Sequence, residues 1–227
     1  MSELDNIIAS FMIPLAASAI GAWLGAHFAF KNEREAKKVN QREVDIASAR
    51  RIIFILSIQF DRLLNFQNQV VEPYRAFPGR WVVMPGMKMH HNEKLHIDPI
   101  DADLIMRLGN AELCMEVTIA DAAFQSAREN IDRRAEFFST ELQPQLGAAG
   151  IEGVSVAQLP DIEKKLGVFV TKTAQAMTET VLECVDGNVE NHERLIKVLH
   201  KFLKDTYPTE KFIKVENPSS EIAVPKK

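Results

Sequence analysis

The chain has 227 residues, with 27 Lys and Arg against 31 Asp and Glu, and its formal net charge is −4. This weakly acidic balance lacks the basic excess of a nucleic-acid-binding surface, so we expect no nucleic-acid partner. The two cysteines, Cys114 and Cys184, have neither C-x-x-C nor zinc-finger spacing, and we interpret them as buried free thiols in a reducing compartment.

Residues 7–30 are the most distinctive stretch, because they contain no Asp, Glu, Lys or Arg. A helix of this length reaches roughly 36 Å, enough to cross the hydrocarbon core of a bilayer. The stretch therefore predicts a transmembrane helix. A cleaved signal peptide is one alternative, but it needs a basic start and a shorter apolar run, whereas Glu3 and Asp5 precede this one. A buried core helix is the other, and such a charge-free run seldom occurs in one.

The basic residues around this predicted span indicate its orientation. The N-terminal side has no Lys or Arg, whereas five basic residues follow the span closely. The positive-inside rule then places the six-residue N-terminus outside and the C-terminal body in the cytoplasm. We expect a single-pass protein of the cell membrane (the inner membrane in a bacterium), with the lipid bilayer as a partner. The five residues are Lys31, Arg34, Lys37, Lys38 and Arg42.

One face of the predicted span carries small residues at every fourth position, namely Ala17, Gly21, Gly25 and Ala29. Such a face lets another helix approach closely, as in the Gly-xxx-Gly dimer motif. It predicts self-association into a homo-oligomer or docking on another membrane protein. The alternative is that Gly and Ala are simply common in membrane spans.

The first helix of the body follows directly. Residues 31–45 are charged helix formers without Gly or Pro, and they predict a helical stalk. From Ile46 to Val71, apolar residues recur at three- and four-residue spacing, and only Gln67 interrupts them. This pattern predicts a helix that faces a core, and its end near Val71 follows from Pro73, which cannot continue it.

A second long helix is predicted from near Asp101, the expected N-cap, to about Leu142, with a pause at Gly109. Its apolar residues have clean helical spacing, and its opposite face is charged.

A third long helix is predicted from about Asp161 to Thr206, with a pause at Gly167. Two signals compete for its start: the capping-box spacing of Ser155 and Gln158, and a proline at position 160. Residues 207–227 predict a flexible tail.

These elements predict an all-α protein. An outside segment 1–6 and a single transmembrane helix 7–30 lead through the stalk 31–45 to a cytoplasmic bundle, 46–206. The bundle is expected to be elongated and antiparallel, with three long helices and one irregular loop at residues 72–99.

The irregular loop is the most plausible location for chemistry, because long structureless loops inside compact domains are uncommon and often functional. Residues 80–84 within it predict a short strand or an extended strip. Three histidines, His90, His91 and His96, precede several aspartates and could bind Zn²⁺ or another borderline metal. The simpler interpretation is a polar loop, since neighbouring histidines on a loop point in different directions.

Two other patterns in the loop have structural alternatives. Met84, Met87 and Met89 could join the histidines in a Cu(I) site, although methionines also fill gaps where a loop covers a bundle. Asp101 and Asp103 could act as an acid–base pair, although helix starts favour Asp anyway.

We expect a non-catalytic scaffold, adaptor or oligomerising component of a membrane complex. The sequence predicts no catalytic residue, no cofactor and no identifiable small-molecule substrate, since phosphate-loop and nucleophile motifs are missing. The alternative is a metal-binding sensor or enzyme that uses residues 84–103. A receptor for a cytoplasmic ligand stays open as a third hypothesis.

Overall fold

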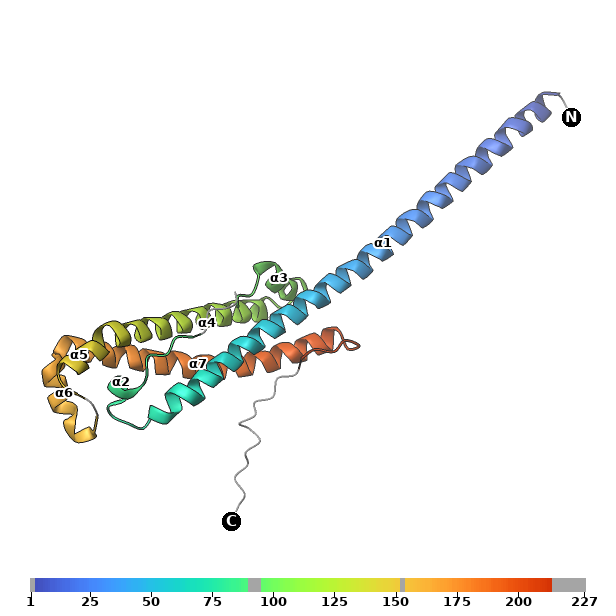
Figure 1. Ribbon diagram of the computed structural model, residues 1–227. Helices are drawn as coiled ribbons and strands as arrows, with labels where there is room; N and C mark the ends of the chain where they lie inside the picture. The colour runs from blue at the N-terminus through green and yellow to red at the C-terminus, as the bar shows by residue number, and fades with distance from the viewer. Residues whose placement is uncertain (1–2, 90–94, 152–153, 214–227) are drawn as a thin grey trace, which may run out of the picture. The chain divides into compact units, whose positions relative to one another are not determined.

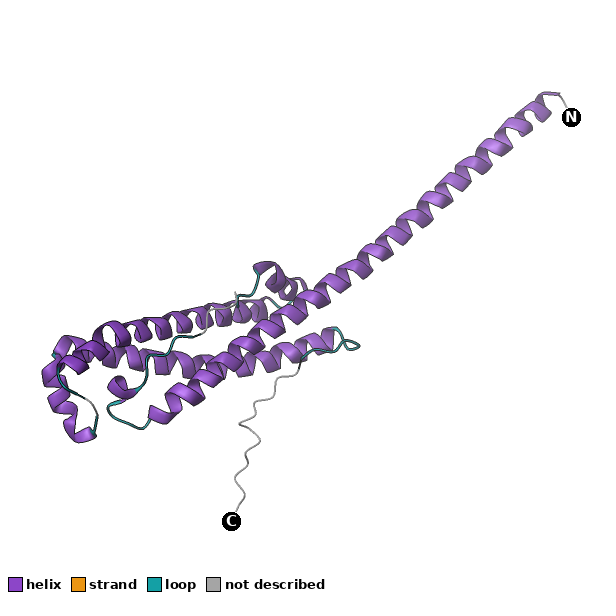
Figure 2. Ribbon diagram, in the orientation of Figure 1, coloured by secondary structure: helices purple, strands orange, loops and turns teal. Residues whose placement is uncertain are grey.

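The structure is a computed structural model that describes residues 3–89, 95–151 and 154–213; the side chains of residues 3–17, 19, 20 and 157 are not described. The chain divides into two compact units, Met1–Ala47 and Ser48–Lys227. All regular elements of the described residues are helical, as Figure 2 shows. The predicted all-α class is confirmed.

Helix α1, Glu3–Phe66, begins in the first unit, ends in the second, and covers the predicted span and stalk. Within the part of the chain that the structure describes, no helix is both long and apolar enough to cross a membrane. The predicted span 7–30 includes residues whose side chains lie outside that part. The transmembrane assignment stays a prediction.

The second unit is a bundle in which three long helices pack together, namely the end of α1, α4 and α7 (Figure 1). On α1, the apolar residues predicted to face the core of the bundle are buried, and Ala49, Ile53 and Leu56 are fully enclosed. The helices are α1 Glu3–Phe66, α2 Arg80–Val83, α3 Pro99–Arg107, α4 Ala111–Phe137, α5 Gln143–Ala148, α6 Leu159–Leu166 and α7 Val168–Thr206, with π-helical turns at Gln67–Val71 and Phe138–Leu142 and 3₁₀ turns at Glu72–Tyr74 and Val156–Gln158.

Side-chain contacts show that α4 and α7 are antiparallel. Near the start of α4, Glu116 accepts a hydrogen bond from Arg194, close to the end of α7. Near the end of α4, Arg134 donates to the hydroxyl of Thr178, in the first half of α7.

Helix α1 is also antiparallel to α7. Gln59 contacts His192, whereas Gln67, just after α1, donates to Asp186, which lies earlier in α7. Since α1 and α4 both oppose α7, they run parallel to each other. The prediction of a wholly antiparallel bundle is therefore wrong for this pair of helices.

The parallel arrangement follows from the connection between α1 and α3, residues 67–98. At its start, Arg75 binds both carboxylate oxygens of Asp186, at 2.8 and 2.7 Å. Just beyond its end, Asp101 of α3 binds Arg51 in the part of α1 where the second unit begins. Antiparallel neighbours need only a short loop. This connection instead runs back along the bundle before α3 starts.

The predicted short strand or extended strip at residues 80–84 is wrong for Arg80–Val83, which form the helical turn α2. The amide of Met84 donates to the carbonyl of Arg80 at 2.9 Å, which closes the turn. A strand would need a neighbouring strand to satisfy its backbone, and the described residues contain none. The helical turn satisfies its own backbone and buries Trp81 and Val82.

The helix starts differ slightly from the predicted ones. Asp98, not Asp101, caps α3 by accepting a hydrogen bond from the amide of Ile100 at 2.8 Å. The pause predicted at Gly167 is a complete break between α6 and α7, where glycine has φ +81°, a conformation that other residues adopt only with strain.

Candidate functional site

His96, one of the three predicted metal ligands, contacts a carboxylate in the structure. Its Nδ1 lies 2.5 Å from Oδ2 of Asp121 in α4. The two partners differ in exposure, since the side chain of His96 is 62% exposed and that of Asp121 only 4%. The pair therefore joins a solvent-facing imidazole to a buried carboxylate, an arrangement that needs further hydrogen bonds to be stable.

Gln59 supplies one of those hydrogen bonds. This fully buried side chain of α1 donates from Nε2 to Oδ1 of Asp121 at 2.6 Å and to the carbonyl of Leu95 at 3.1 Å. Its Oε1 lies 3.2 Å from Nε2 of His192 in α7. One amide thus links all three long helices to the segment that carries His96.

His192 is fully buried at the end of this network and contacts Phe124 edge-on. Its Nδ1 lies 2.9 Å from the carbonyl of Asn188. Desolvation by burial is the largest effect on this imidazole and lowers its pKa, while the Asn188 carbonyl and the charge of Asp121 raise it. The net result is a pKa below the ordinary 6.5, so His192 is neutral at pH 7.

The lowered pKa of His192 predicts an acid-sensitive bundle. Between pH 6.5 and the folded-state pKa, His192 binds a proton in the unfolded chain but stays neutral in the folded chain. The contribution to stability is complete above pH 6.5 and declines below it, by up to about 1.4 kcal/mol per pH unit. Urea unfolding at pH 7, 6 and 5 should show this decline in the native chain. The decline should be smaller in His192→Gln and unchanged in a matched His200→Gln chain.

The other two predicted metal ligands cannot be placed beside His96. His90 and His91 lie outside them. Among the described residues, no group of three or more His, Cys, Asp or Glu side chains is placed to hold a metal ion. The metal interpretation of the three histidines stays an untested prediction.

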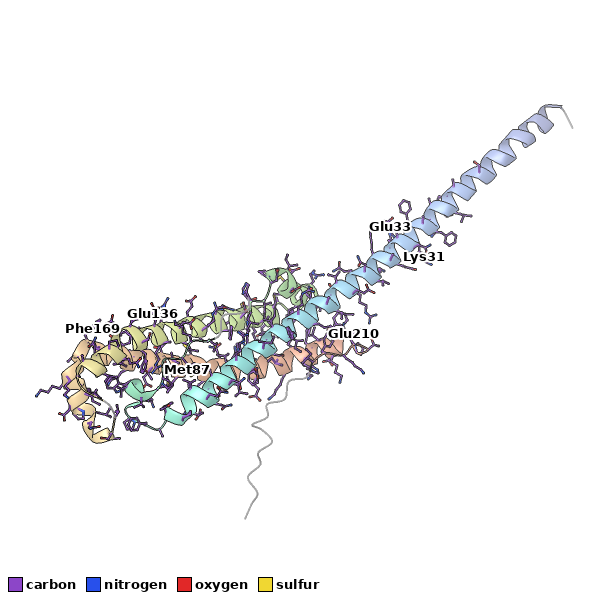
Figure 3. All side chains as sticks on the ribbon, in the orientation of Figure 1. Lys31, Glu33, Met87, Glu136, Phe169 and Glu210 are labelled. Atoms are coloured by element: carbon purple, nitrogen blue, oxygen red, sulfur yellow. The ribbon has the colours of Figure 1, made fainter. Side chains whose placement is uncertain are left out.

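The methionines of the same segment differ in their surroundings. Met84 and Met89 are buried, whereas Met87 is half exposed on the connection, where Figure 3 marks it. This difference fits packing of an irregular segment over helices better than a shared thioether site.

The two aspartates considered as an acid–base pair are each bound to an arginine. Asp101 accepts from Nε of Arg51 at 2.8 Å, and Asp103 accepts from Arg107 at 3.0 Å. Hydrogen bonding from Arg51 outweighs burial and lowers the pKa of Asp101. Asp101 therefore docks α3 on α1, and Asp103 pairs with an arginine of its own helix.

The His96–Asp121 pair resembles the base and its orienting carboxylate in a nucleophilic triad, so a nearby nucleophile is the decisive test. Cys114 is the thiol that lines the same cleft as His96 and Asp121. Its thiol donates to the carbonyl of Ala102 at 3.3 Å, and the described contacts of His96 do not include it. The geometry therefore supplies an oriented imidazole without an activated thiol.

The predicted helix-association face lies on α1 in the first unit. A Cβ added at Gly21 or Gly25 would meet no atom of the chain within 4 Å. Ala29 is exposed, and the side chain of Ala17 is not described. The described part of this face is therefore uncovered by the chain itself.

Sequence patterns did not identify Gln59, Asp121 or His192 as parts of a site. Each is a polar residue within an otherwise apolar helix face. This interruption is the feature of the sequence that could have indicated a buried polar network. In α7, for example, His192 lies between Val189 and Ile196 on the buried face.

The chain matches no protein-family model, no curated protein and no solved structure in comparisons with known proteins. We therefore base the functional proposal on the residues described above.

Proposed function

We propose that this chain is a single-pass membrane protein whose cytoplasmic helical bundle acts as a non-catalytic scaffold, adaptor or oligomerising component of a membrane complex. Residues 7–30 would cross the membrane with the N-terminus outside. The small-residue face of that helix would contact a second copy or another membrane protein.

The observation that carries this proposal is the exposure of large apolar side chains on α1. Trp23, Leu24, Phe28 and Phe30 are all exposed within eight residues of helix. Large apolar side chains clustered on a surface normally mark contact with a membrane or a partner. The basic residues that begin at Lys31 are placed where a cytoplasmic boundary would favour them.

The membrane part of the proposal is tested by extraction and labelling. In a Cys114→Ser/Cys184→Ser background, single cysteines are introduced as Ser2→Cys or Ser219→Cys. The protein should resist alkaline carbonate extraction. In sealed vesicles of native orientation, a membrane-impermeant maleimide should label only the Ser2→Cys chain. Labelling of Ser219→Cys before permeabilisation, or release by carbonate, would contradict the proposal.

The association part is tested on the small-residue face. Gly21→Ile with Gly25→Ile should reduce crosslinked oligomers of the full chain in mild detergent by about tenfold or more, because branched side chains keep the two backbones apart. Since a Cβ at either glycine meets nothing in the chain, the loss would report contact with another molecule.

The matched control is Ala19→Ile with Ala26→Ile, which introduces the same two side chains on a different face of the helix. Oligomers that persist in the glycine variant would assign association to the bundle. A strictly monomeric native chain with no co-purifying protein would contradict the scaffold role.

A further inference from the structure

A cleft of about 560 Å³ lies between α3 and α4 in the second unit. This volume falls in the range of small-molecule sites, roughly 300–1,000 Å³. Its walls include Ile97, Pro99, Ala102, Met106 and Ala122, and its polar groups include Thr118 and Gln125. Mostly apolar walls with a few convergent polar groups are typical of a binding site for an organic molecule.

The charge of the cleft is one-sided. Three carboxylates line it, from Asp103, Asp121 and Glu129, and none of the described lining residues is Lys or Arg. Asp103 accepts a hydrogen bond from Arg107, and Glu129 lies 3.9 Å from Arg133, so outside cations offset both. Asp121 is different, because the side chain that faces its Oδ2 among the described residues is a histidine, His96, and not an arginine.

Asp121 is also the buried member of the three. It accepts hydrogen bonds from Gln59 at 2.6 Å and from the amide of Ile97 at 3.3 Å, and both bonds approach Oδ1. Among the described residues, the printed contact of Oδ2 is with His96. Because His96 is mostly exposed, water can solvate its imidazole once it leaves Oδ2, and a cation inside the cleft can take its place.

We propose that this cleft binds a small organic cation with an apolar body, whose ammonium group pairs with Oδ2 of Asp121. The apolar body would lie against Pro99, Ala102 and Met106, and the ammonium would replace His96. A charge-assisted hydrogen bond to a carboxylate shielded from water is stronger than one at the surface. An anion would meet three carboxylates, and a neutral molecule would leave Oδ2 to His96.

The proposal adds ligand binding to the scaffold and does not depend on membrane anchoring, since all the residues it uses belong to the second unit. The probes are 2-phenylethylamine, 2-phenylethanol and 3-phenylpropanoate, which share a ring and differ in charge. Binding is measured by calorimetry on the full chain in phosphatidylcholine nanodiscs, with empty discs subtracted. The amine should bind at least about tenfold more tightly than the alcohol, and the carboxylate most weakly.

Two variants locate the binding. Asp121→Asn should abolish the preference for the amine over the alcohol. Because Asp121 supports the Gln59 network, this variant could unfold, and circular dichroism would reveal it. Ala122→Phe then decides, since it fills the cleft from an exposed position and should remove amine binding. Ala176→Phe, at an exposed position of α7 outside the cleft, is the control that should bind normally.

Equal binding of amine and alcohol by the native chain would overturn the proposal. So would amine binding that survives Ala122→Phe in a folded chain. Neither result would affect carbonate extraction or crosslinking, so a failure here is distinguishable from a failure of the proposed function.

Discussion

Replacing Trp81 by Ala is expected to lower the free energy of unfolding of the bundle by about 3–5 kcal/mol, the usual cost of truncating a buried large aromatic side chain. Trp81 is only 4% exposed and belongs to an apolar cluster that closes one end of the second unit. The cluster joins α2 to α6, α7 and the turn after α4, through Ile162, Ala174 and Leu142. Removing the indole would leave a cavity between these elements.

The measurement is urea unfolding followed by circular dichroism at 222 nm. Phe169→Ala is the matched control, because Phe169 is also aromatic and lies at the start of α7 but is 80% exposed (Figure 3). The control should shift stability by less than about 0.5 kcal/mol. If the two variants were equally stable, α2 would not be part of the core.

Replacing Arg134 by Leu is expected to destabilise the bundle by about 2–4 kcal/mol, because it leaves buried carbonyl groups without a hydrogen-bond donor. The guanidinium is almost fully buried in α4, and it donates to the carbonyl of Met84 at 2.7 Å and to that of Pro85 at 3.0 Å. Burial lowers its pKa to about 10, so it stays charged at pH 7. The adjoining Gly86 lies so close to the end of α4 that a Cβ there would stand 3.1 Å from the carbonyl oxygen of Ala135 and 2.9 Å from Phe138 in the turn that follows.

Tryptophan fluorescence distinguishes loss of the hydrogen bonds between Arg134 and the connection from unfolding of the whole bundle. In a Trp23→Phe background, Trp81 is the single tryptophan. In Arg134→Leu its emission should shift to the red at urea concentrations where helical signal persists, because the connection detaches before the long helices separate. Arg133→Leu is the control, since Arg133 is exposed on the same helix and should cost less than about 0.5 kcal/mol. Coincident transitions by both probes would contradict local detachment.

The long helices could be predicted because they follow a single physical rule. Apolar residues recur at helical spacing, and those on α1 and α4 are buried as expected, including Leu63, Val117 and Phe124. Helix ends were predictable within a few residues where Pro or Gly occurs, as at Thr206. Gln67, which interrupted the pattern, is explained by its hydrogen bond to Asp186.

The connection and the site could not be predicted, because they depend on contacts between distant positions. The local sequence predicted Trp81 and Val82 as part of a strand or an extended strip, whereas in the fold they form a helical turn that packs against α6 and α7. The network has the same origin. In the sequence, Gln59 is a single polar residue on an apolar helix face. Its hydrogen bond to Asp121, 62 positions later, becomes visible only in the folded chain.

The parallel course of α1 and α4 has a consequence for biosynthesis. Helices α4 and α7 are antiparallel neighbours and can pair soon after both emerge from the ribosome. Helix α1 must wait for α7, because Gln59 and His192 are 133 positions apart. At roughly 5–20 residues per second, this delay is about 7–27 seconds. Helix α1, the first helix of the bundle to be synthesised, therefore waits longer than α4 before its contacts with α7 can form.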